Sequence, residues 1–116
     1  MTVLFCDIAN STPLAARLGP EVMHALLNRF FDLALGEVHR YEGTINQFLG
    51  DGFMALFGAP NAYEDHARRA VLAALGLQHR LGERRADFGL PPGEDLAVRI
   101  GLNTGLVVVE IRRAYV

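Results

Sequence analysis

The chain has 116 residues, a formal net charge of −2 at pH 7, 51% hydrophobic residues and 21% charged residues. This length accommodates one compact domain or part of one, and the composition argues against an intrinsically disordered chain. The nearly neutral charge also argues against a nucleic-acid partner, because proteins that bind nucleic acids usually carry a basic surface. All eleven basic residues are Arg and the sequence contains no Lys, which excludes sites built on a lysine.

The chain has a single cysteine, Cys6, which lies inside an apolar run. One cysteine cannot form an internal disulfide, so we expect a reducing, cytoplasmic location and a buried thiol that acts as a small hydrophobe. No apolar stretch approaches the roughly 18 residues that span a bilayer. The first residues also lack the basic region and cleavage site of a signal peptide. The sequence therefore predicts no membrane segment.

The first part of the chain predicts one strand followed by two helices. The apolar run 2–6 ends at Asp7 and is typical of a buried strand. Residues 10–12 are helix-capping types, so we expect a short helix over 13–18 that ends at Gly19. A longer helix begins at Pro20, carries apolar residues at helical spacing, and is expected to end at Gly43.

The rest of the chain predicts a hairpin, a third helix and two further strands. Residues 44–49 and 53–57 read as strands joined by a tight turn that carries Asp51. A helix is expected from about 64 to 82, then a surface loop over 82–95, and then strands over 96–103 and 106–111. The predicted order is β-α-α-β-β-α-β-β. It indicates a ferredoxin-like α/β sandwich with a mixed or antiparallel sheet and helices on one face.

Two acids carry any chemistry that the sequence reveals. Asp7 follows a buried strand and Asp51 occupies a hairpin tip, and these two positions can meet at one edge of a sheet. Adjacent carboxylates repel, and a hard divalent cation such as Mg²⁺ or Mn²⁺ relieves that repulsion. Residues 8–12 then lead into a helix N-terminus, whose free N–H groups bind anions. Singly, Asp7 has the simpler interpretation of a helix cap and Asp51 that of a turn residue; together they favour a site for metal-assisted phosphoryl chemistry.

Several other sites are excluded by particular residues. A P-loop requires a Lys. A phospho-acceptor receiver domain pairs its first acid with an adjacent one, where this chain has Ile8, and a haloacid-dehalogenase-like phosphatase has a second Asp where this chain has Ala9. Zinc is disfavoured because the histidines lie on predicted helices without ligand spacing. Each of them is expected at the surface: His24, His39, His66 and His79.

Three segments together resemble one family, the class III adenylate/guanylate cyclases. They are VLFCDIANST at 3–12, NQFLGDGFMALFG at 46–58 and RIGLNTGLVVV at 99–109. The first is similar to the family's first metal-binding strand and loop, the second to its second metal hairpin, and the third to the strand pair that follows. The resemblance covers essentially the whole chain in order. The loop 58–60 with EDHA at 64–67 resembles the bacterial members, in which a cyclase domain belongs to a larger multidomain protein.

The resemblance implies a two-metal reaction that converts ATP or GTP to the 3′,5′-cyclic nucleotide and pyrophosphate. By this resemblance, two Mg²⁺ or Mn²⁺ ions are held by Asp7, Asp51 and the backbone carbonyl of Ile8. The triphosphate is cradled by the backbone N–H groups of Ala9, Asn10, Ser11 and Thr12. In the family the sites lie between two such domains, so a homodimer or a paired cyclase domain is expected.

The chain departs from the family pattern at the position that reads the purine. Members that use ATP commonly have Lys three residues before the hairpin glycine, and guanylate-specific members often have Glu. This chain has Gln47, whose amide both donates and accepts hydrogen bonds and so leaves adenine and guanine undecided.

The C-terminal end also departs from the family pattern. In the family, the last strand pair leads to a helix whose Asn and Arg stabilise the transition state, and residues 109–116 resemble only the start of that segment. We therefore expect residues 1–116 to be a partial catalytic domain that is weak or inactive alone, with a sheet face left partly uncovered and a tendency to self-associate. Two alternatives stay open: a non-catalytic relative that regulates or dimerises, and a plain ferredoxin-like interaction domain.

Overall fold

The computed structural model describes residues 1–59 and 62–105, so the strand expected over 106–111 lies outside the described residues. The strands and helices occur in the order β-α-α-β-β-α-β, with a short 3₁₀ helix before the last strand. Their bounds are β1 Thr2–Ile8, α1 Ser11–Leu18, α2 Pro20–Arg40, β2 Thr44–Phe48, β3 Gly52–Phe57, α3 His66–Glu83, η1 Arg85–Phe88 and β4 Val98–Thr104.

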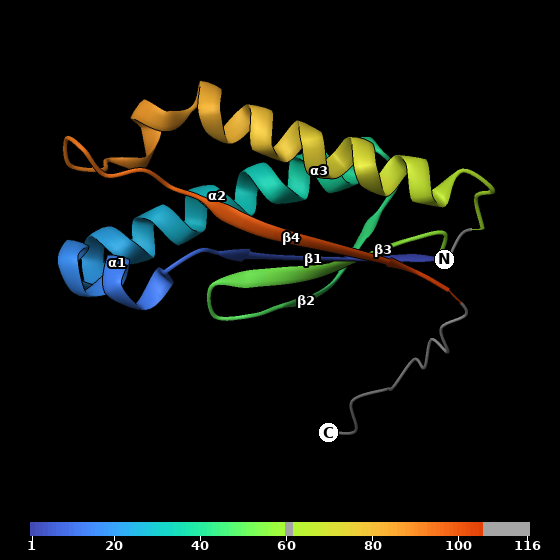
Figure 1. The fold of residues 1–116 in the computed structure, drawn as a ribbon, viewed down its shortest axis with the longest axis horizontal. Helices are drawn as coiled ribbons and strands as arrows, with labels where there is room; N and C mark the ends of the chain where they lie inside the picture. Colours follow the sequence, from blue (N-terminus) through green and yellow to red (C-terminus); the bar gives the residue numbers. More distant parts are fainter. Residues whose placement is uncertain (60–61, 106–116) are drawn as a thin grey trace, which may run out of the picture.

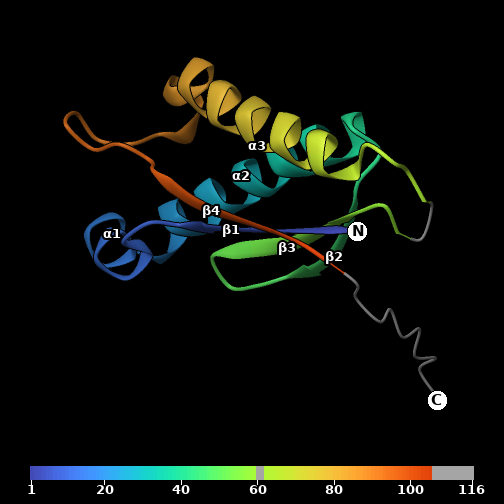
Figure 2. The ribbon, with the colours of Figure 1, turned by 45° about the vertical axis from the view of Figure 1, so that its right-hand side comes forward.

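The four strands form one sheet in the order β2-β3-β1-β4, and every neighbouring pair is antiparallel. Figures 1 and 2 show α2 and α3 on the same side of this sheet. The expected α/β architecture with helices on one face is therefore present. The antiparallel form of the expected sheet is confirmed and a mixed sheet is wrong for the four described strands, because each helical crossover skips one strand position. The parallel strands β1 and β2 are separated by β3, and β3 and β4 are separated by β1.

The end of α2 differs from its prediction in a way that local hydrogen bonds explain. The helix stops at Arg40, and the left-handed residue is Glu42, with φ 65°, rather than Gly43. The N–H of Gly43 donates to the carbonyl of Val38 at 2.9 Å, which is the closing bond of a Schellman motif. Gly43 is needed for a different reason: a Cβ there would lie 2.5 Å from the ring of Phe57.

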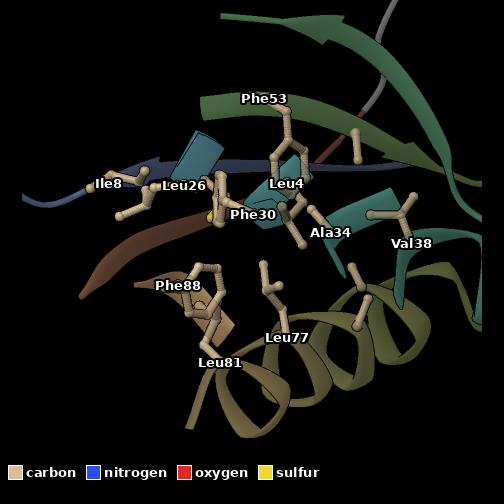
Figure 3. Close-up of a cluster of buried hydrophobic side chains, with 14 of the residues drawn as sticks. Leu4, Ile8, Leu26, Phe30, Ala34, Val38, Phe53, Leu77, Leu81 and Phe88 are labelled. Carbon is tan, nitrogen blue, oxygen red and sulfur yellow. The ribbon is translucent and has the colours of Figure 1, made fainter. Parts of the chain in front are cut away.

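The hydrophobic core lies between the sheet and the two long helices (Figure 3). Alternate residues of β1 and β3 point into it, as the period of two requires, and α2 and α3 contribute residues at helical spacing. The residues labelled in Figure 3 are Leu4, Ile8, Leu26, Phe30, Ala34, Val38, Phe53, Leu77, Leu81 and Phe88. Within the described ranges, no helix is long and apolar enough to cross a membrane.

Cys6 confirms the expectation of a buried, inert thiol. Its exposed fraction is 2%, and it belongs to the core cluster. Burial, with a smaller contribution from the charge of the neighbouring Asp7, raises the pKa of the Cys6 thiol to about 12. A thiol that stays protonated at neutral pH is a poor nucleophile.

The other face of the sheet, which we call the open face, is covered by none of the described helices. Strand alternation places on it the residues that lie between the core positions. They include Phe5 and Asp7 of β1, Gln47 of β2, Gly52 and Met54 of β3, and Arg99 and Gly101 of β4. Phe5 is 49% exposed there. This face carries both polar groups and uncovered apolar surface.

Candidate functional site

The fold brings the two predicted acids to one end of the sheet. Asp7 is the second-last residue of β1 and is paired with Gly52, the residue directly after Asp51. The N–H of Ile8 donates to the backbone carbonyl of Asp51 at 3.0 Å. Figure 1 shows the β2–β3 turn beside the point where β1 leads into α1. Residues that are 44 positions apart in sequence thus meet, as the pattern of the two acids predicts.

Gly52 makes this approach of the two strands possible. A Cβ at position 52 would lie 2.1 Å from the carbonyl oxygen of Cys6 and 2.9 Å from the Cα of Asp7. Since no real side chain tolerates such distances, only glycine lets the hairpin pack this closely on β1. Gly50, on the other side of Asp51, has nothing within 4 Å of its own Cβ position. The two glycines of the turn therefore have different roles.

Asp7 is paired with a cation, Arg99 of β4. Nε of Arg99 donates to Oδ1 of Asp7 at 2.9 Å, and Nη2 donates to Oδ2 at 3.4 Å. The Arg99 side chain is 71% exposed, and ion pairs at such exposure contribute about 0–1 kcal/mol, so other ions can readily replace it. The sequence does not reveal this pair. Strand alternation puts Arg99 on one face of its strand, but only the strand order places β4 beside β1.

Asp51 has a neutral partner instead. The hydroxyl of Ser11, the first residue of α1, donates to Oδ2 of Asp51 at 2.7 Å. Ser11 was expected to be a helix-capping residue and to offer its backbone N–H to a phosphate, but it is the first residue of α1, and no side chain caps that helix. Its side-chain contact depends on the left-handed conformation of Asn10, with φ 55° and ψ 41°, which turns the chain after β1.

The loop that was predicted to cradle phosphates is partly engaged within the fold. The N–H of Ala9 donates to the carbonyl of Ala97 at 2.8 Å. The first helical bond runs from the N–H of Leu14 to the carbonyl of Asn10 at 3.1 Å. Helix geometry leaves the preceding N–H groups, those of Ser11 and Thr12, without an intrahelical acceptor. These two N–H groups point out of the N-terminal end of α1, where the helix dipole also favours an anion.

Gln47, the candidate for purine recognition, lies apart from the acids of its own chain. It is exposed in β2 and paired with Met54, which in turn is paired with Phe5. Gln47 is therefore two strands and two residues away from Asp7, roughly 12 Å by ordinary strand spacing. The fold thus brings together Asp7, Ile8 and Asp51 but not Gln47.

The donor groups fit a hard cation better than zinc. Across residues 1–59 and 62–105, no three His, Cys, Asp or Glu side chains gather as a metal-binding group. Three of the histidines are exposed as expected, whereas His66 is half-buried with Nδ1 2.7 Å from the hydroxyl of Thr2. Mg²⁺ is typically held by one or two carboxylates, with water and substrate phosphates completing its octahedron. Asp7 and Asp51 beside a helix N-terminus match that donor set.

A cavity of about 320 Å³ opens on the open face beside Asp7. Its lining includes Phe5 and Leu49 as well as the Asp7–Arg99 pair. The volume lies at the lower end of the range for small-molecule sites, and the mixture of apolar and charged groups is typical of them. Asp7 therefore adjoins a space that can take part of an organic ligand.

Comparison with known proteins gives a consistent family. The family described as "Adenylate and Guanylate cyclase catalytic domain" matches residues 1–114. Adenylate cyclase 1 of Rhizobium meliloti is 37% identical over 113 residues, which are 94% of this chain. The crystal structure of the guanylyl cyclase Cya2 superposes with a TM-score of 0.82 at 36% identity, over 90% of this chain. The guanylate cyclase domain of RhGC from Catenaria anguillulae, solved in complex with GTP, gives 0.74 at 31% identity over 87% of this chain.

The chain spans only part of each of these proteins. The matched region is 16% of the Rhizobium protein, 53% of the Cya2 chain and 53% of the RhGC chain. The similarity thus extends along nearly all of this chain and over about half of each solved domain.

Proposed function

Because the chain belongs to the adenylate and guanylate cyclase catalytic domain family, we propose that it forms part of a site that converts ATP or GTP to the 3′,5′-cyclic nucleotide and pyrophosphate. The observation that carries the proposal is the meeting of Asp7 and Asp51 at one end of the sheet, beside the start of α1. We place this activity in cyclic-nucleotide signalling, in the cytoplasm, where both nucleotides are available.

Different residues of the chain would bind the metal ions and the phosphates at this site. Asp7, Asp51 and the carbonyl of Ile8 would hold two Mg²⁺ or Mn²⁺ ions. When bound, such ions lower the pKa of the ribose 3′-hydroxyl and neutralise the charge of the leaving pyrophosphate. Ser11 and Thr12 offer backbone N–H groups to the phosphates. Ala9 and Asn10, the other two residues of the proposed cradle, shape the turn that presents them. Arg99 adds a positive charge on the same face.

Gln47 is the proposed purine contact, and its amide suits adenine and guanine alike. Since it lies roughly 12 Å from Asp7 of the same chain by strand geometry, we propose that a second cyclase domain, in a homodimer or a paired arrangement, covers the open face. The exposed ring of Phe5 supports this arrangement, because burying it against a partner is favourable.

The test is a thermal-shift titration with Mn²⁺ and a non-cyclisable ATP or GTP analogue. The wild-type chain, Asp7→Asn and Asp51→Asn are compared with Asp32→Asn, which changes an exposed acid of α2. A ligand at 100 times its Kd stabilises by about 2.7 kcal/mol, which raises Tm by about 10 °C in a chain of this length. We expect this shift in the wild type and in Asp32→Asn, and its loss in the two site variants, with all four proteins folded.

A second candidate function is a non-catalytic cyclase-like module for regulation or dimerisation. It is favoured by one observation: Asp7 is already paired with Arg99, which competes with a metal ion for that carboxylate. Metal-dependent nucleotide binding without pyrophosphate release would support this alternative. A wild type that shows no shift would mean that residues 1–116 hold the fold without a working site. Unfolding of Asp7→Asn or Asp51→Asn would count against both, because acids at a sheet end should be dispensable for the core.

A further inference from the structure

We propose that Ser11 is a positioning residue for Asp51: its hydroxyl holds one carboxylate oxygen and thereby orients the acid at the hairpin tip. This inference rests on the proposed function, because it assigns a second role within the same site. It concerns the side chain of Ser11, whereas the phosphate cradle concerns its backbone N–H.

The contact joins two elements that are remote in sequence. Oγ of Ser11, the first residue of α1, lies 2.7 Å from Oδ2 of Asp51 in the β2–β3 turn, 40 residues away. An ionised carboxylate only accepts hydrogen bonds, so the serine hydroxyl is the donor. A bond from a hydroxyl to a charged acceptor is shorter and about twice as strong as a neutral one. The contact is therefore strong enough to select one orientation of the carboxylate.

The two partners differ in how firmly the fold holds them. Ser11 follows the left-handed Asn10, and the preceding Ala9 is anchored by its N–H to the carbonyl of Ala97 at 2.8 Å. Leu14, one turn further along α1, is buried with 3% exposure. The backbone of Asp51 is anchored too, since its carbonyl accepts the N–H of Ile8 at 3.0 Å, but its carboxyl group extends from the turn beside Gly50, whose surroundings are open. The rigid element thus supplies the hydroxyl, and the turn supplies the acid that needs orientation.

The neutrality of this partner matters for a metal ligand. Arg99 offsets the charge of Asp7 and so competes with any cation for that carboxylate. The hydroxyl of Ser11 orients Asp51 without reducing its charge, and it engages Oδ2 of the carboxylate. Hydrogen bonds from such outer groups to metal ligands typically change metal affinity 10- to 100-fold when they are removed.

The experiment measures the affinity for Mn²⁺ alone, from the electron paramagnetic resonance signal of free Mn²⁺, in the whole chain. Ser11→Ala removes the hydroxyl and keeps the backbone N–H. Ser11→Thr keeps both, and Thr44→Ala removes an exposed hydroxyl of β2 as a control away from the acids. We expect Ser11→Ala to weaken Mn²⁺ binding about 10-fold, Ser11→Thr to restore it, and Thr44→Ala to leave it unchanged. If Ser11→Ala lowers Tm but binds Mn²⁺ like the wild type, Ser11 is only a helix-start residue and the proposal is overturned.

A second measurement keeps this inference separate from the proposed function. Backbone ¹⁵N order parameters of residues 50–51 are recorded without metal in the wild type, Ser11→Ala and Thr44→Ala. We expect lower order parameters in Ser11→Ala alone, since the turn loses its side-chain anchor. Unchanged values there overturn the positioning role even if the chain binds no metal. By contrast, equal Mn²⁺ binding by the wild type and Asp51→Asn overturns the proposed function while the order parameters still decide the role of Ser11.

Discussion

The two faces of the sheet are built from the same strands, but one face packs in the core and the other carries the charged groups of the candidate site. On β1, Leu4 and Ile8 are at most 1% exposed beneath the helices, whereas Phe5 is 49% exposed and Asp7 holds an exposed arginine on the open face. Neighbouring residues of one strand point to opposite faces of the sheet, so a residue that the core requires lies next to a residue that is free to bind a ligand. A catalytic face can thus vary in sequence without cost to the core behind it.

The largest expected difference between the two faces is in how much a substitution lowers the free energy of unfolding. Phe30 is fully buried, with its ring centroid 6.1 Å from that of Phe53, and Phe5 is half exposed. We expect Phe30→Ala to lower the free energy of unfolding by about 3–5 kcal/mol, because it leaves a cavity. Phe5→Ala should cost about 1 kcal/mol or less. Urea denaturation measures both values, and similar losses for the two variants would refute the division between the faces.

The second largest expected effect concerns the close contact between the β2–β3 turn and β1. Gly52→Ala forces a Cβ onto the carbonyl of Cys6, so we expect a loss of about 1–3 kcal/mol and a displacement of Asp51 that weakens Mn²⁺ binding. Gly50→Ala is the matched control, since its Cβ meets open space. Denaturation together with Mn²⁺ titration distinguishes the two. Equal behaviour of the two variants would mean that close strand contact is unimportant for the acids.

The smallest effect appears in alkaline solution and concerns Cys6. Burial raises the pKa of the Cys6 thiol to about 12 from an ordinary value of 9.0, so above pH 9 the unfolded state releases its proton first. Stability from this group is complete below pH 9 and is lost as the pH rises towards 12, by about 1.4 kcal/mol per pH unit. Denaturation at pH 8 to 10.5 should show this slope in the wild type and not in Cys6→Ala.

A thiol moved from the core face to the open face tests whether burial causes the alkaline loss of stability. Adding Phe5→Cys to Cys6→Ala moves the thiol by one residue onto the open face, where it should ionise near its ordinary pKa. We expect the alkaline slope to stay absent in this double variant. A slope equal to that of the wild type would show that the open face is as dry as the core.

Much of the fold followed from local patterns. The apolar run before Asp7, the helical spacing after Pro20 and the turn around Asp51 placed these elements within a few residues of their observed bounds. The errors have physical causes. The helix α2 ended early because Glu42 took the left-handed conformation, and the close packing of Gly43 on Phe57 is invisible in sequence.

The sequence by itself determined three features of the candidate site: the two acids, the glycine-flanked turn and the start of the helix. A charged ligand can bind where these features meet. The sequence determined them because turns, helix starts and strand alternation depend on neighbouring residues. Only the tertiary structure decided that β4 lies beside β1, which pairs Arg99 with Asp7, and that α1 returns to the hairpin, which joins Ser11 to Asp51. These contacts span 92 and 40 residues, and strand order and chain reversal depend on how the whole core packs rather than on any local signal.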